Sequence, residues 1–179
     1  MNRNALFIHV PKTGGTSIRA ALWPDTKNDH TVASALPAAA WENAFTFAFV
    51  RHPYERLASA YVYHTGPRYH GGFRFDGLSF AEYLDIVANP PPPVMPAFAS
   101  MTEYVVPRGW SAKRIDFLGR FRRLREDAQK LFAILGVDRD LPHLNANEGA
   151  KYSAILGPGE KQRIHKIYAE DFSTFGYDP

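Results

Sequence analysis

Two short runs of continuous apolar residues constrain the fold of this chain more than any other feature. Residues 5–10 and 45–50 carry few polar side chains, and each run ends abruptly at a proline or at Arg-His-Pro. Strands that are apolar on both faces are typical of parallel sheets covered by helices on both sides, whereas half-exposed strands alternate apolar and polar residues. The two runs therefore predict strands of a buried, mostly parallel sheet.

Helical patterns separate the predicted strands. Ser79 and Glu82 form a capping box, and Pro53 suits the first turn of a helix because its missing N–H has no partner there. Strands that alternate with helices predict an α/β domain, and we interpret residues 1–179 as one such domain. The predicted helices are 16–23, 53–64, 79–88, 124–135 and a last one after Pro158, and the weaker strand candidates are 115–118 and 30–32.

The first run leads directly into Pro11-Lys12-Thr13-Gly14-Gly15-Thr16-Ser17 and then into a helix. Glycines let the backbone approach a ligand closely, and the N–H groups and dipole at a helix start attract an anion. Lys12 adds a full charge, and Thr13, Thr16 and Ser17 add hydroxyl donors. The loop is not a Walker A motif, because the lysine precedes both glycines and no Gly-Lys-Ser/Thr occurs in the chain. The segment predicts a short anion-binding loop.

The second run ends in a second candidate anion site. Arg51 follows the strand at the edge where parallel sheets bind ligands, and Ser59 lies on the next helix. Ser59 comes three residues after Arg56, so these two side chains share one helix face. Two anion sites on neighbouring strand ends suit a ligand that carries two separate phosphate groups.

These two motifs resemble those of the sulfotransferases that use 3′-phosphoadenosine 5′-phosphosulfate (PAPS), in particular the carbohydrate branch of family 2 type. Three further segments resemble that branch in the same order, so the likeness spans nearly the whole chain. One departure is Arg122, where the family often has an acidic residue. The three segments begin with Phe117-Leu118-Gly119-Arg120-Phe121, Leu141-Pro142-His143-Leu144-Asn145 and Tyr168-Ala169.

The resemblance implies a fold and a donor site. The fold is a single-domain three-layer α/β sandwich whose phosphate loop is similar to that of P-loop NTPases. The donor would be PAPS and its product 3′-phosphoadenosine 5′-phosphate (PAP), with no metal required. Lys12 would be catalytic, and the donor-binding residues would be Lys12, Thr13, Gly14, Gly15, Thr16, Ser17, Arg51, Ser59, Lys151 and Tyr152.

An acceptor hydroxyl also needs a base, and His30 is our first candidate because it lies between the two anion motifs and beside the predicted strand at 30–32. His64 and then Glu55 are the alternatives. We also expect His64, Arg68 and Arg74 to contact the acceptor, a glycan, a glycolipid or a small hydroxylated molecule. His9, inside the first strand, is interpreted as a core histidine.

Composition excludes several classes of protein. The chain has no cysteine, which excludes disulfide scaffolds, thiolate metal sites and cysteine nucleophiles. A net charge of +3 is too small for nucleic-acid binding by bulk charge, although residues 113–125 hold six cations. We expect a cytoplasmic protein that neither inserts stably into a membrane nor binds nucleic acid. A homodimer is compatible with the sequence. A kinase or NTPase with an atypical phosphate loop, or an inactive nucleotide-binding module, remain the alternative functions.

Overall fold

The computed structural model describes residues 4–26, 30–73, 75–106, 115–142 and 152–179. They fall into two compact units. The first unit comprises Met1–Arg51 and Met101–Asn147, and the second comprises His52–Ser100 and Glu148–Pro179. Within the described ranges, every helix is too short or too polar to cross a lipid bilayer.

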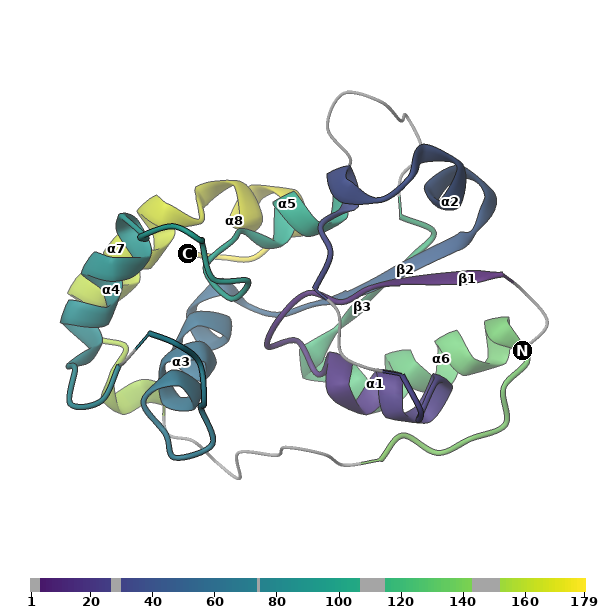
Figure 1. Cartoon of the computed structure of the whole chain (residues 1–179), viewed down its shortest axis with the longest axis horizontal. Helices are drawn as coiled ribbons and strands as arrows, with labels where there is room; N and C mark the ends of the chain where they lie inside the picture. Colours follow the sequence, from purple (N-terminus) through teal and green to yellow (C-terminus); the bar gives the residue numbers. More distant parts are fainter. Residues whose placement is uncertain (1–3, 27–29, 74, 107–114, 143–151) are drawn as a thin grey trace. The chain divides into compact units, whose positions relative to one another are not determined.

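The first unit is built on a parallel sheet of three strands, in the order β1-β2-β3 (Figure 1). The strands are β1 (Ala5–Ile8), β2 (Phe45–Val50) and β3 (Phe117–Arg120). Phe47 on the central strand is in register with Phe7 on one side and Phe117 on the other. Since all three strands run the same way, their carboxyl ends meet at one edge, and the loops that follow them lie together.

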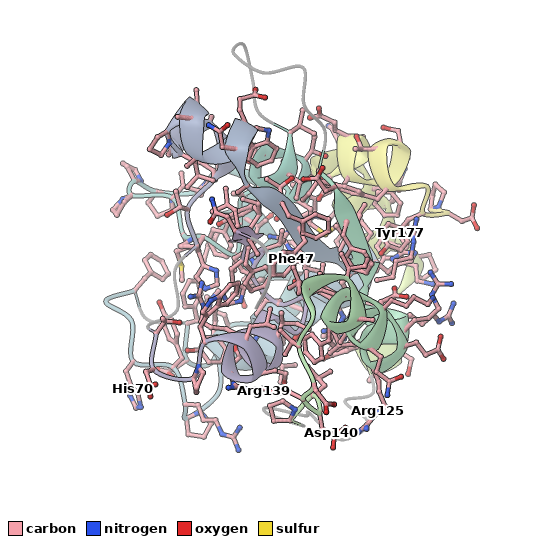
Figure 2. All side chains as sticks on the ribbon, turned by 90° about the vertical axis from the view of Figure 1, so that its right-hand side faces the viewer. Phe47, His70, Arg125, Arg139, Asp140 and Tyr177 are labelled. Carbon is pink, nitrogen blue, oxygen red and sulfur yellow. The ribbon has the colours of Figure 1, made fainter. Side chains whose placement is uncertain are left out.

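Helices cover both faces of this sheet. Figure 1 shows α1 (Gly15–Leu22) and α6 (Leu124–Leu135) on one side and α2 (Ala38–Asn43) on the other. The apolar residues of α1 and α6 pack against the rings of Phe47 and Phe49, which are fully buried. Figure 2 shows Phe47 inside the molecule and Arg125, on the opposite face of α6, at the periphery. The unit also contains η1 (Ala33–Ala35), α5 (Met101–Val105) and η2 (Phe121–Arg123).

The second unit is helical in its described residues. Its helices surround a cluster rich in aromatic residues, which includes Tyr83 and Phe75. The guanidinium of Arg56, which is 2% exposed, donates to the carbonyl oxygens of Ala97 (3.3 Å) and Ala99 (2.8 Å). This contact fastens the chain segment before α5 to the first helix of the unit. The elements are α3 (Pro53–His64), α4 (Phe80–Ala88), η3 (Tyr152–Ala154), α7 (Pro158–Ile167) and α8 (Ala169–Phe175).

Most of the predicted elements are confirmed. The α/β class with a parallel central sheet is confirmed, as are the strand at 45–50, the helix at 53–64 and the capping box of Ser79 and Glu82. Gly136 ends α6 with φ 65°, a left-handed conformation that glycine adopts without strain. The short helices α2, α5 and α8 were not predicted.

Two strand predictions need correction. Residues 30–32 form no strand; the His30 side chain contacts the chain after β1, with its Nδ1 2.9 Å from the His9 carbonyl oxygen. The third strand begins at Phe117 rather than at residue 115. The Asp116 carboxylate accepts hydrogen bonds from the Thr46 backbone N–H (2.7 Å) and hydroxyl (2.9 Å), which sets the point where β3 joins β2.

Candidate active site

The segment after β1 forms a tight loop that ends at the start of α1. Lys12 has φ 68°, a left-handed conformation that is uncommon for a residue with a side chain, and Gly14, the N-cap of α1, has φ 86°. The Thr13 hydroxyl donates to the Val10 carbonyl oxygen at 2.8 Å, and this side chain is fully buried. Thr13 therefore closes the loop with its hydroxyl, and its place among the donor-binding residues stays a prediction. Thr16 stays partly exposed at the first turn, while Ser17 is buried.

Gly15 is required by the histidine at the end of β1. A Cβ at this position would overlap the imidazole ring of His9. His9 is 4% exposed, as the sequence predicted, and its ring stacks on Phe7 with centroids 5.2 Å apart. The rigid ring thus forms one wall of the loop, and only glycine leaves room for the backbone of α1 to reach it.

His30 is brought to the same place. Its ring centroid lies 4.3 Å from that of His9, and its Nδ1 lies 2.9 Å from the His9 carbonyl oxygen. Because a carbonyl oxygen only accepts, Nδ1 must carry the hydrogen. In neutral His30 the lone pair is then on Nε2, which is the form that a general base needs.

Lys12 has a pKa well below the ordinary value of a lysine. Burial, and then the nearby charge of Arg51, lower the pKa of Lys12 from 10.5 to about 8. Both causes penalise the protonated amine, so the site without ligand holds a positive charge at a cost. An anion bound beside Lys12 removes that cost, which is the electrostatic property of an anion site.

Arg51 follows β2 and reaches the loops that follow both neighbouring strands. It is 8% exposed, and its guanidinium donates to the Lys12 carbonyl oxygen at 3.4 Å. The guanidinium carbon lies 3.9 Å from the centre of the Phe121 ring, which follows β3. The first unit therefore brings Lys12, Arg51 and the start of α1 together at the carboxyl edge of the sheet. This arrangement can hold a multiply charged anion.

The remaining predicted residues belong to the second unit or fall outside the described residues. Ser59 (5% exposed, on α3) and the partly exposed Tyr152 belong to the second unit, as does the exposed Arg68. His64 is buried: its Nδ1 lies 2.8 Å from the Tyr83 hydroxyl and its ring stacks on Phe75. This packing holds the ring inside the aromatic cluster, and the predicted contact of His64 with the acceptor stays a prediction. Two predicted residues, Arg74 and Lys151, lie outside the described residues.

Two residues of this site were given no role from the sequence. Phe121 was noted only as part of a motif, although it follows the third strand just as Lys12 and Arg51 follow the other two. Asp127 on α6 is buried, and its carboxylate accepts from the Arg120 backbone N–H at 2.9 Å, which holds the end of β3. The shared position after a strand is the signal that could have identified Phe121. The described ranges contain no group of three or more residues suited to a metal ion.

An α/β sheet whose first strand leads through a glycine-containing loop into a helix, and whose second strand ends at a buried arginine, suits the binding of a phosphate or sulfate group. A model of the sulfotransferase family matches residues 2–178. The chain therefore belongs to the sulfotransferase family, of family 2 type, whose members transfer sulfuryl groups. No curated protein matches it.

Replacing Gly15 by alanine tests the packing of the loop. The new Cβ overlaps His9, so we expect Gly15→Ala to lower the free energy of unfolding by roughly 1–3 kcal/mol, as overpacking does. Gly159→Ala on α7 is the matched control, because nothing lies within 4 Å of its added Cβ. The control should be neutral or slightly stabilising. Urea unfolding measures both, and equal stabilities of the two variants would contradict the contact of Gly15 with His9.

Proposed function

We propose that this protein transfers a sulfuryl group from PAPS to a hydroxyl, or an amine, of a glycan, a glycolipid or a small hydroxylated acceptor. One observation carries the proposal. Lys12 and Arg51 lie at the ends of adjacent strands, close enough for the charge of Arg51 to lower the Lys12 pKa. Lys12 and Arg51 repel each other, so an anion with several negative groups that binds between them would relieve this repulsion.

The residues present fit such a donor. When bound, PAPS supplies the sulfuryl group. The backbone N–H groups at the start of α1 and the Thr16 and Ser17 hydroxyls would hold its 5′-phosphate, and Gly14 and Gly15 keep the backbone free of Cβ atoms there. Arg51 would bind the 3′-phosphate, and we assign Ser59 to the same phosphate from the family resemblance.

Lys12 has the second role of neutralising negative charge that grows on the departing phosphate. Charge stabilisation and positioning are the main contributions that a protein can make to such a transfer. A partly buried amine is well suited to this task, because its interaction with the new charge is weakly screened. His30 would accept the acceptor proton at Nε2, since its Nδ1 hydrogen is directed to the His9 carbonyl oxygen.

The base assignment predicts a change in the pH dependence of the rate. In the wild-type enzyme kcat/KM should fall as the pH is lowered, because protonation of Nε2 removes the base. His30→Gln should lose this acidic limb and lower kcat roughly 10²-fold or more. His70→Gln, at an exposed histidine, is the matched control and should keep the wild-type profile. A His30→Gln enzyme with unchanged kcat across pH would reject the assignment.

The function itself is tested with PAPS that carries radioactive sulfate. Wild-type protein and the Lys12→Met variant are incubated with a panel of neutral sugars, glycolipids, amino sugars and small phenols, and labelled products are separated by chromatography. We expect at least one acceptor to be labelled by the wild type and none at a comparable rate by the variant. Transfer of phosphate from ATP with Mg²⁺, together with no labelled product from PAPS, would overturn the proposal in favour of a kinase.

A further inference from the structure

We propose that Phe121 is a positioning residue for the donor site, and that its ring selects ligands with a second phosphate by holding Arg51. This inference rests on the proposed function, because it concerns the phosphate that Arg51 would bind. Phe121 begins η2, directly after β3, and lies in the first unit together with Arg51 and Gly14.

The contact between Phe121 and Arg51 is close. The guanidinium carbon lies 3.9 Å from the ring centre, within the range in which a cation is attracted to the face of an aromatic ring. An arginine side chain has many rotamers, and ordering them opposes binding unless the protein has already restricted them. The ring supplies that restriction before a ligand arrives.

A neutral support has an advantage over a charged one at this position. A carboxylate beside Arg51 would also fix the guanidinium, but it would neutralise the charge that attracts the phosphate. The ring of Phe121 leaves the full positive charge of Arg51 in place, and this charge contributes to the lowered pKa of Lys12. The support therefore orders the cation and preserves its affinity for anions.

Phe121 also borders the other half of the site. A Cβ added at Gly14 would lie 3.3 Å from Phe121 Cδ2 and 2.6 Å from Leu124 Cδ2. Two side chains that follow β3, Phe121 and Leu124, thus lie next to the N-cap of α1. The Arg51 guanidinium lies over the ring of Phe121. The end of this segment is fixed in turn by the Asp127 carboxylate, which accepts from the Arg120 backbone N–H.

The neighbouring Leu124 makes a sharp experiment possible. Calorimetric titration gives the dissociation constants of PAP and of adenosine 5′-phosphate, which lacks the 3′-phosphate. Phe121→Leu should lower the preference for PAP over adenosine 5′-phosphate about 3–10-fold, because the 3′-phosphate loses an ordered cation. Leu124→Ala should weaken both ligands equally and keep the preference, since it disturbs only the loop. Phe121→Tyr should retain the wild-type preference for PAP, because it keeps the aromatic ring.

Each outcome decides the inference. A wild-type protein that prefers PAP, together with a Phe121→Leu variant that keeps the full preference, would overturn the role of Phe121 and leave the proposed function intact. A wild-type protein without preference for PAP would overturn both. If Phe121→Leu does not fold by circular dichroism, Phe121→Met takes its place, because it also fills the space with a flexible apolar side chain that has no aromatic face.

Discussion

Replacing Lys12 by methionine is expected to lower kcat roughly 10²–10³-fold, the usual loss when one group that stabilises developing charge is removed. The same variant should be more stable than the wild type at pH 7. Burial and Arg51 lower the Lys12 pKa to about 8, so the folded protein holds this charge at a cost of roughly 3 kcal/mol. Methionine keeps the length of the side chain without the charge. Sulfate transfer and thermal unfolding measure the two effects.

The stability gain should depend on pH in a defined direction. At pH 7 the amine is protonated in both the folded and the unfolded state, so the cost is present in full. Between pH 8 and 10.5 the unfolded state binds more protons than the folded state, and the wild type gains stability as the pH rises. The advantage of Lys12→Met should therefore shrink over this interval. Lys166→Met, at an exposed lysine, is the matched control and should alter neither rate nor stability. If Lys12→Met is less stable than the wild type at pH 7, this would contradict the explanation that burial and Arg51 lower the Lys12 pKa.

Replacing Arg51 by methionine is expected to raise the dissociation constant of PAP roughly 10²-fold, because a charge-assisted contact to phosphate is lost. Removing this charge should also raise the Lys12 pKa toward its ordinary value, since Arg51 is one of the two causes of the shift. Calorimetric titration with PAP measures the affinity. The matched control is Arg125→Met, which Figure 2 shows at the periphery. Equal affinities of Arg51→Met and wild type would contradict the assignment of Arg51.

Much of the first unit could be predicted from its sequence because local signals and tertiary packing agree there. The run at 45–50 is apolar on both faces and becomes the central strand, which is buried by β1, β3 and helices. Lys12 and Arg51 were identified because each follows such a run, and parallel strands bring their carboxyl ends to one edge. The strand predicted at 30–32 was wrong: these residues form no comparable apolar run, and the structure has no strand there.

Side-chain burial was harder to predict than the elements. His64 was predicted to contact the acceptor, yet its ring packs in the aromatic cluster, with Nδ1 2.8 Å from the Tyr83 hydroxyl. The Thr13 hydroxyl looked like a ligand donor, but it closes its own loop onto Val10. Such roles depend on residues that are distant in sequence, or on the exact turn of the backbone, and neither is encoded in a local pattern. The role of Phe121 depends on contacts with both other strand ends and is hidden for the same reason.

The most direct test of the central claim is a thermal-shift series on the wild-type protein with PAP, ADP, and ATP with Mg²⁺. A ligand at 100 times its Kd adds about 2.7 kcal/mol to the free energy of unfolding, which raises the melting temperature of a domain of this size by several degrees. The account predicts such a rise with PAP and a much smaller one with ADP, which lacks the 3′-phosphate. A rise with ATP and Mg²⁺ alone would contradict the account and would identify the loop after β1 as the site of an NTPase or kinase.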